Sequence, residues 1–265
     1  LVCGDVEGKF GSLYARINKV IKTAGDFEAL FCVGDFFGSD FASFRDYISE
    51  CPKIPIPTYI VSFISHDVSN FIDNPNGCEL YPNITYLGSK GVYSFMSGLR
   101  VIYAATQPIV EESTPKAYDF ASPLEVCSLA GIDLLLTTQW PLNVSNKVPN
   151  FPANIKPNFA SSSMSRLASL MRPRYHFAAS EGVFYERPPY RNHRVLQEKA
   201  TNVTRFIGLA KVKNSENLKY LYALKLVPLE QMKREDVILQ PPDTTENPYI
   251  MMDFKATEQV KETAY

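Results

Sequence analysis

Apolar and polar positions follow two different patterns along the chain. The apolar runs at residues 1–3 and 30–33 each end in Gly-Asp, which is typical of buried parallel strands. Between these runs, apolar residues recur at helical spacing: Leu13, Ile17, Val20 and Ile21. This order predicts a right-handed strand-helix-strand unit at the start of the chain.

After this unit the pattern predicts mostly short strands. We expect a helix at 39–48 capped by Ser39, a strand at 58–64, and a helix at 161–171. Short apolar runs predict further strands, and residues 141–160, rich in Pro and Asn, predict a long loop. These further strands are expected at 84–87, 92–96, 99–104, 132–137, 206–212 and 220–227.

The pattern predicts one α/β domain with a mixed sheet or two packed sheets. We place this domain at residues 1–240 and include in it a hairpin at 206–227. Residues 241–265 follow Gln240 and are polar, so we expect them to form a tail or linker.

Composition and charge change this picture little. The chain has 27 Lys and Arg against 28 Asp and Glu, so its net charge of −1 argues neither for nor against nucleic acid. No apolar stretch approaches 18 residues, which predicts no membrane contact. The five cysteines are scattered without a C-x-x-C pair and are expected to be reduced. Leu1 opens directly on a strand, so we expect the natural N-terminus a little upstream.

Two carboxylates follow the first two predicted strands. Asp5 and Asp35 would sit at neighbouring strand ends, where open α/β sheets bind ligands. Two carboxylates in one cleft are what a two-metal phosphoesterase needs. The same two residues could instead accept hydrogen bonds from the N–H groups of the following loop or helix.

The chain resembles the metallophosphoesterase family at these two Gly-Asp blocks. Longer blocks resemble one branch, the CwfJ-type (CWF-nineteen-like) proteins, and the 185–193 block is specific to it. The matching blocks are residues 4–8, 32–38, 77–80, 83–88, 172–178, 185–193 and 240–249.

This resemblance implies a calcineurin-like metallophosphoesterase-type sandwich of mixed β-sheets flanked by helices. It also implies a nuclear, spliceosome-associated protein related to the lariat debranching enzyme. The implied partners are spliceosomal proteins and the debranching enzyme, with intron RNA as a further candidate. Family members usually continue into C-terminal CwfJ domains, so the chain would be an N-terminal domain, expected to be monomeric.

The family's metal ligands carry over only in part. Asp5 and Asp35 are kept, but Glu7 stands where the first His is expected. The remaining histidine positions are occupied by Phe63-Ile64, Thr138 and Ser180-Glu181-Gly182. His66-Asp67 lies two residues from its position, and His176 and His193 are out of register.

The surviving oxygen ligands predict no resident cofactor, or at most one weakly bound Mg²⁺ or Mn²⁺ on Asp5, Glu7 and Asp35. Glu181 or Asp67 could complete such a site. Without a cation, three carboxylates in one cleft would repel, and one would hold a proton.

A second candidate surface lies in the segment 172–205, where arginines alternate with aromatic residues. Arginine and aromatic side chains together can hold single-stranded RNA. The alternative is that the aromatic residues belong to the core and the arginines pair locally. The candidates for RNA or partner binding are Arg172, Arg174, His176, Arg187, Tyr190, Arg191, His193 and Arg194, with the last four following the stiff Pro188-Pro189 pair.

The leading hypothesis is a non-catalytic domain in pre-mRNA splicing that partners or activates lariat debranching. The rival is a phosphodiesterase or ribonuclease with a reduced metal site, and a protein scaffold is the third. The enzyme hypothesis requires His66 or His176 to reach Asp5 and Asp35.

Overall fold

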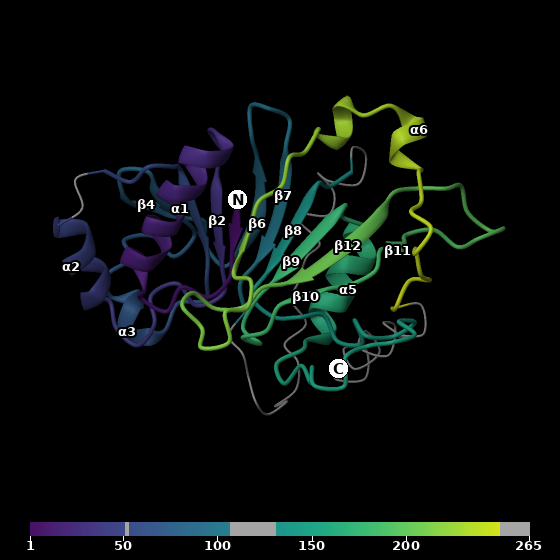
Figure 1. Cartoon of the computed structure of the whole chain (residues 1–265). Helices are drawn as coiled ribbons and strands as arrows, with labels where there is room; N and C mark the ends of the chain where they lie inside the picture. The colour runs from purple at the N-terminus through teal and green to yellow at the C-terminus, as the bar shows by residue number, and fades with distance from the viewer. Residues whose placement is uncertain (51–52, 107–130, 250–265) are drawn as a thin grey trace, which may run out of the picture.

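Two β-sheets packed face to face form the centre of the molecule, with helices on the outside (Figure 1). The computed structural model describes residues 1–50, 53–106 and 131–249. Both sheets have parallel strands in the middle and antiparallel strands at the edges. This confirms the predicted sandwich of mixed sheets flanked by helices.

The first sheet is built on the predicted strand-helix-strand unit. Its order is β13-β1-β2-β3-β5-β4. The strands are β1 (Val2–Cys3), β2 (Leu30–Val33), β3 (Thr58–Val61), β4 (Cys78–Tyr81), β5 (Ile84–Tyr86) and β13 (Leu221–Tyr222). The helix α1 (Phe10–Ala24) connects β1 to β2, and α2 (Ala42–Glu50) and the short α3 (His66–Ser69) follow.

The second sheet holds most of the remaining strands. Its order is β10-β12-β9-β8-β7-β6, and β11 pairs with β12. The strands are β6 (Lys90–Ser94), β7 (Arg100–Ala104), β8 (Leu134–Thr137), β9 (Tyr175–Ala178), β10 (Tyr185–Glu186), β11 (Tyr190–Arg191) and β12 (Val203–Gly208). The helix α5 (Ser162–Met171) precedes β9.

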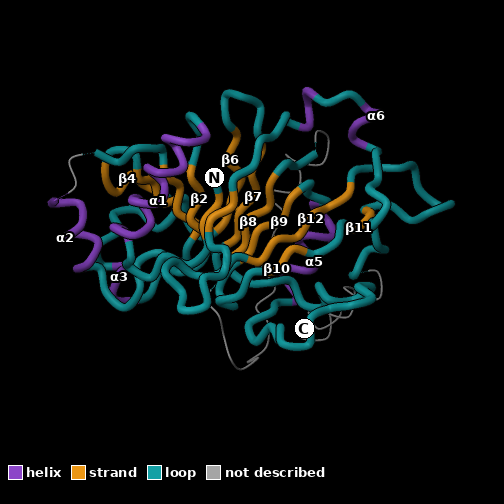
Figure 2. The backbone as a smooth tube through the Cα atoms, in the orientation of Figure 1, coloured by secondary structure: helices purple, strands orange, loops and turns teal. Residues whose placement is uncertain are grey.

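Three apolar layers hold the sandwich together (Figure 2). Side chains such as Phe31 and Phe177 fill the space between the two sheets. Leu13 and Ile17 of α1 cover the outer face of the first sheet, and Leu167 of α5 covers that of the second. Alternate residues of each parallel strand therefore face opposite layers, because strand side chains alternate in direction.

The predicted hairpin at 206–227 is wrong. β12 pairs with β9 in the second sheet, whereas β13 pairs with β1 in the first. Residues 209–220 instead cross from one sheet to the other. Only one backbone hydrogen bond of a hairpin kind is present, from Ala210 N–H to Lys219 O at 3.1 Å. Apolar alternation predicted the strands, but it does not specify the partner of each strand.

The C-terminal segment packs against the domain instead of forming a free tail. The 3₁₀ turn η1 (Leu229–Gln231) and α6 (Arg234–Val237) lead into it. Thr245 N–H donates to Pro189 O at 2.8 Å, and Tyr249 is buried beside Tyr190. The predicted polar tail is thus wrong for residues 241–249, and its remainder at 250–265 lies outside the described residues.

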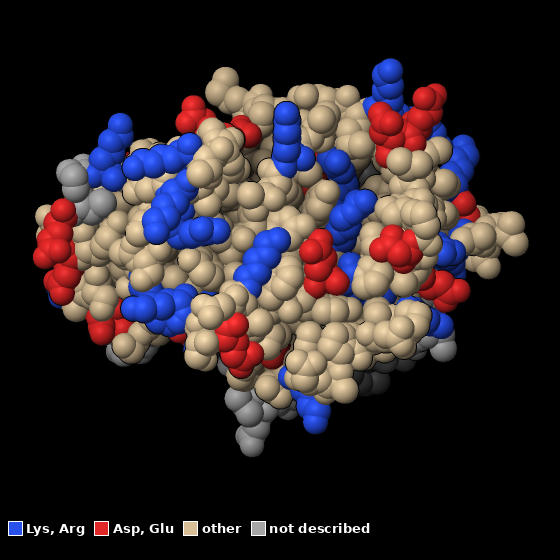
Figure 3. Space-filling model, in the orientation of Figure 1, with Lys and Arg blue, Asp and Glu red and all other residues tan. Residues whose placement is uncertain are grey.

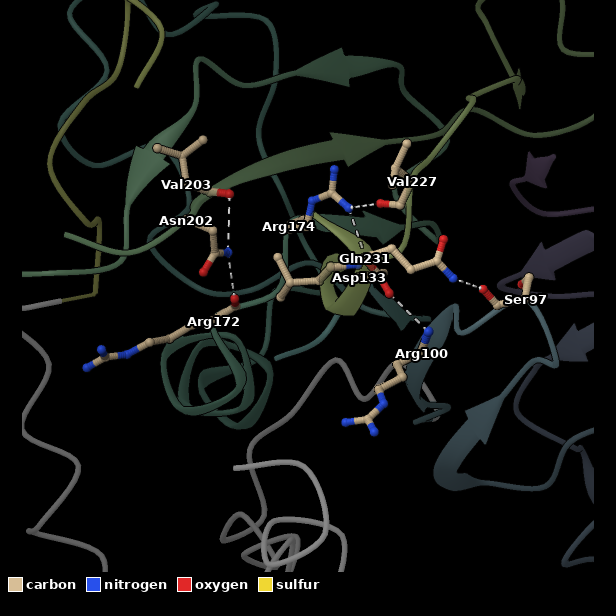
Figure 4. Close-up of polar contacts among 10 residues, drawn as sticks. Ser97, Arg100, Asp133, Arg172, Arg174, Asn202, Val203, Val227 and Gln231 are labelled. Atoms are coloured by element: carbon tan, nitrogen blue, oxygen red, sulfur yellow. Dashed lines mark hydrogen bonds and ion pairs between the residues drawn. The ribbon is translucent and has the colours of Figure 1, made fainter. Parts of the chain in front are cut away.

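A buried carboxylate fixes the start of this C-terminal segment (Figure 4). Asp133 Oδ1 accepts hydrogen bonds from Arg174 Nη1 at 3.0 Å and from Leu229 N–H at 2.8 Å. Its Oδ2 accepts from Arg100 N–H at 3.1 Å. Arg174 also donates to Val227 O at 2.6 Å. Asp133 therefore ties the segment to the first residues of β7 and β9.

Smaller expectations have mixed outcomes. The N-terminal cap of α2 is Asp40, whose carboxylate accepts from Ser43 N–H at 3.1 Å, and not Ser39. Among the described residues no helix combines the length and apolar character of a membrane span.

The loop between β11 and β12 contains a strained leucine, which gives the first prediction. Leu196 has φ of 68° and is fully exposed. A left-handed backbone costs a residue with a Cβ roughly 1–2 kcal/mol, more than the entropy that glycine loses. Leu196→Gly is expected to raise the free energy of unfolding by about 0.5–1 kcal/mol in urea titrations. Val195→Gly, at a neighbour outside the left-handed region, should lower it, and a loss in both variants would contradict the argument.

Candidate functional site

The loops after β1 and β2 interlock at the predicted strand ends. Asp35 O accepts from the N–H groups of Val6 and Glu7 at 2.8 and 3.0 Å. Gly34 has φ of 104°, and a Cβ there would lie 2.1 Å from Asp5 Oδ1. Glycine is therefore required at Gly34, because it allows the two aspartates to approach each other.

Asp5 joins the two sheets through its side chain. Its Oδ1 accepts from Asp35 N–H at 2.8 Å, and its Oδ2 accepts from Ser180 N–H at 2.9 Å. Ser180 follows β9 of the second sheet, and Asp5 is only 5% exposed. Both carboxylate oxygens are thus used by the backbone.

Asp35 and Glu7 also have protein partners. Asp35 Oδ1 accepts from Gly38 N–H at 2.8 Å. Glu7 pairs with Lys9 at 2.7 Å and with Lys211 at 3.4 Å. These contacts agree with the alternative that the aspartates accept backbone hydrogen bonds.

Burial acts upward on the pKa of all three carboxyl groups, but the net shift differs between them. It raises the pKa of Asp5 from 3.8 to about 6, because desolvation outweighs the hydrogen bonds from Asp35 and Ser180. It also raises the pKa of Asp35. For Glu7, burial acts upward, but Lys9 and Lys211 lower its pKa overall. Glu7 therefore serves as the anionic partner of two lysines.

The positions expected for further metal ligands have other uses. Thr138 Oγ1 accepts from Thr106 N–H at 2.8 Å and donates to Thr106 O at 2.7 Å. The Glu181 carboxylate accepts from the N–H groups of Asn158 and Phe159, each at 2.8 Å. Glu181 therefore orders the loop at 141–160 instead of joining Asp5 and Asp35.

His176 does not reach the two aspartates. Its Nε2 lies 2.8 Å from Thr137 Oγ1, and its ring packs edge-on against Phe206. Complete burial lowers the pKa of His176 to about 3, so the ring is neutral. The side chains of His66 and Asp67 lie outside the described part of the structure.

The donor set does not fit a two-metal centre. The described residues contain no group of three or more His, Cys, Asp or Glu side chains placed to hold a metal ion. The oxygens of Asp5 accept backbone hydrogen bonds, and those of Glu7 face two ammonium groups. A divalent ion would have to displace these partners.

The predicted RNA surface at 172–205 is corrected at several of its residues. Tyr190 is buried and packs against Tyr249, so Pro188-Pro189 does not expose it. Arg187 is buried, and His193 is only 8% exposed. The candidates divide into buried residues (His176, Arg187, Tyr190 and His193), half-buried residues (Arg174 and Arg191) and exposed residues (Arg172 and Arg194).

Arg187 was expected to bind RNA phosphates, but its guanidinium donates hydrogen bonds to protein oxygens instead. Its Nε donates to Val144 O at 2.8 Å, and Nη2 donates to Asn146 O at 2.9 Å. Nη1 donates to Pro188 O and to Thr245 Oγ1 at 2.7 and 2.8 Å. Its guanidinium lies 5.1 Å from the centre of the Tyr190 ring. This residue therefore joins the loop after β8 to the C-terminal segment.

Sequence reasoning missed several residues of the site. Lys9 was detectable, because it lies two positions from Glu7. Lys211 had no such signal, since it meets the site only through the crossing segment, and Ser180 was placed at the site by the resemblance but not as a hydrogen-bond donor to Asp5.

These features define a two-sheet α/β scaffold with Gly-Asp strand ends at the junction of its sheets and carboxylates bound by the chain itself. Over 94% of its length the chain is similar to CWF19-like protein 1, which confirms the resemblance to the CwfJ-type proteins. It is 45% identical to the Mus musculus protein, 44% to that of Homo sapiens and 41% to the Caenorhabditis elegans homolog. The chain covers 48%, 48% and 47% of these proteins, about half of their length.

Other comparisons add less. No protein-family model matches the chain. Among solved structures, TT1561 of Thermus thermophilus is similar with a TM-score of 0.49 and 10% identity, over 80% of this chain and 88% of that chain.

Proposed function

We propose that the chain is a non-catalytic domain acting in pre-mRNA splicing, at the stage of intron-lariat turnover. It would act as a binding partner or activator of lariat debranching. Homology to CWF19-like protein 1 supports the splicing context. The scaffold, related to that of phosphoesterases, supports a role beside an enzyme of that kind.

One observation carries the non-catalytic assignment: both carboxylate oxygens of Asp5 accept backbone N–H groups, one from each sheet. Each of these oxygens keeps a lone pair, but Asp5 is only 5% exposed and is held by backbone groups of both sheets, which leaves little room for a metal ion with an open position for water or substrate. Glu7 in place of histidine, paired with Lys9 and Lys211, supports the same conclusion. The proposal allows no resident cofactor, or at most one weak Mg²⁺ or Mn²⁺.

The proposal includes a nuclear location and a monomeric domain. Its partners would be spliceosomal proteins and the debranching enzyme, with intron RNA as a further ligand. It involves no membrane.

Metal binding provides the first test. Titration of the 265-residue chain with Mn²⁺ in a calorimeter is expected to give no heat, or one weak site with an affinity no tighter than about millimolar. Asp35→Ala should leave this result unchanged, since no strong site depends on Asp35. Two tightly bound ions that disappear in Asp35→Ala would contradict the proposal.

Activity provides the second test. The chain alone should not cleave a 2′–5′ branched RNA at any Mn²⁺ concentration, while its addition should raise the rate of a debranching enzyme on that substrate. Cleavage by the chain that is lost in Asp35→Ala would establish a phosphodiesterase with a reduced metal site. If the chain neither cleaves the RNA nor stimulates the debranching enzyme, the activator role is refuted and the role of a protein scaffold remains.

A further inference from the structure

The open edges of the two sheets meet on one face of the molecule. β13 is the edge of the first sheet, and β10 is an edge of the second. Tyr222 of β13 donates its hydroxyl hydrogen to Glu186 Oε1 of β10 at 2.9 Å. Its ring packs against Phe177 of β9, with ring centres 5.4 Å apart. We call the surface formed by Tyr175, Phe184, Glu186, Arg205, Lys219 and Tyr222 the seam.

Cations lie directly over the aromatic rings of the seam. Lys219 Nζ lies 3.9 Å from the centre of the Tyr222 ring and 5.2 Å from that of Phe184. The Arg205 guanidinium lies 5.6 Å from the centre of the Tyr175 ring. Tyr175, Phe184 and Tyr222 are each half-buried, so parts of their rings remain accessible. The seam thus combines half-buried aromatic rings with the cations that lie over them.

The positive charge of the seam is not neutralised by neighbouring carboxylates. Within the described residues, neither Lys219 nor Arg205 forms an ion pair, and the exposed Lys225 follows β13 without one. The acidic member, Glu186, accepts the Tyr222 hydroxyl. Figure 3 shows Lys and Arg side chains gathered over α1, and Lys, Arg, Asp and Glu side chains interspersed across the middle of this face.

We propose that the seam binds single-stranded RNA, with phosphates on Lys219 and Arg205 and unpaired bases against Phe184 and Tyr222. Aromatic faces interleaved with cations are the means by which proteins hold single strands without reading sequence. A duplex offers no free base faces to such a surface. The choice of RNA rests on the proposed function in intron turnover.

This surface differs from the one that the sequence indicated. Arg187, Tyr190 and His193 are committed to internal contacts, whereas the seam is assembled from four separated strands and the segment before β13. Four of the six seam residues lie in the segment 172–205 that the sequence indicated, but Lys219 and Tyr222 join them only in the structure.

The test measures binding of a fluorescein-labelled oligouridylate to the 265-residue chain by fluorescence anisotropy at several salt concentrations. The oligonucleotide has about 12 nucleotides, which is within the range of single-strand site sizes. Lys219→Gln combined with Arg205→Gln should weaken binding by about tenfold, because two phosphate contacts are lost. The slope of log affinity against log salt should fall by about 1.4. Phe184→Leu should weaken binding at least about fivefold, through the lost stacking of one base.

Two further variants serve as matched comparisons. Lys233→Gln removes an exposed cation just before α6, outside the seam, and should leave affinity unchanged. Glu186→Gln removes the negative charge of the seam and should tighten binding. Melting temperatures of all variants, compared with wild type, separate loss of binding from loss of fold.

The outcomes separate this inference from the proposed function. RNA binding by the seam is refuted if wild type does not bind the oligouridylate, or if folded Lys219→Gln/Arg205→Gln binds it as tightly as wild type. Either result holds even if debranching is still stimulated. If wild type binds no RNA and the double variant no longer stimulates debranching, the seam is a protein interface and the inference is overturned. RNA binding through the seam without stimulation would instead refute the activator role alone.

Discussion

Between pH 4 and pH 7, wild type is expected to lose about 3 kcal/mol of stability relative to Asp5→Asn. The folded chain raises the pKa of Asp5 to about 6 from 3.8, mainly because the carboxyl is buried. The unfolded chain therefore releases the Asp5 proton at a lower pH than the folded chain does. Stability linked to this proton is fully present below about pH 4 and is lost as pH rises through 6, at about 1.36 kcal/mol for each pKa unit.

Urea unfolding of both proteins at several pH values across that range measures this difference. A difference that stays constant across the range would show that Asp5 is ionised in the fold throughout. Asp40→Asn is the matched comparison, because hydrogen bonding to Ser43 N–H lowers the pKa of this exposed carboxyl. Its stability difference from wild type should stay nearly constant across that range, because a carboxyl with a lowered pKa is ionised above about pH 4 in both the folded and the unfolded chain.

Arg187→Met is expected to lower the free energy of unfolding by about 3–5 kcal/mol. The side chain donates four hydrogen bonds to oxygens of Val144, Asn146, Pro188 and Thr245. Methionine fills much of the same volume but leaves these buried oxygens without a donor, and such losses approach those of a broken buried ion pair. Urea unfolding at constant pH gives the value.

Two comparisons identify the cause of that loss. Arg194→Met, at an exposed position, should change stability by less than about 0.5 kcal/mol. Arg187→Lys should retain the charge but lose most of the directed hydrogen bonds, giving an intermediate loss. Hydrogen exchange in Arg187→Met should accelerate at residues 141–148 and 244–249, and unchanged exchange there would contradict the role of Arg187 as their common anchor.

The start of the fold was predictable because its information is local. The apolar runs before Asp5 and Asp35 and the helical spacing of Leu13 and Ile17 specify strand, helix and strand without reference to distant residues. The partner of β13 was not predictable, because the alternation of apolar and polar residues around Tyr222 fits a strand in either sheet. Its pairing with β1 instead of β12 depends on how residues 209–220 cross between the sheets.

The candidate site was predictable at the strand ends and less so elsewhere. Gly34 and Asp35 mark the junction in the sequence, but Ser180, the second donor to Asp5, comes from the other sheet. The aromatic and basic pattern around Tyr190 fits an exposed surface or a core equally well. Its outcome depends on Thr245 and Tyr249, which cover this region from the end of the described chain.

The pairing of β1 with β13 has a consequence for synthesis of the chain. β1 leaves the ribosome long before its second neighbour, Leu221–Tyr222, is made. One edge of β1 therefore remains open during translation, when unpaired strand edges are prone to intermolecular pairing. The first sheet can close only after most of the chain has emerged, so mutations that slow closure should reduce yield in cells more than they reduce the stability of the finished protein.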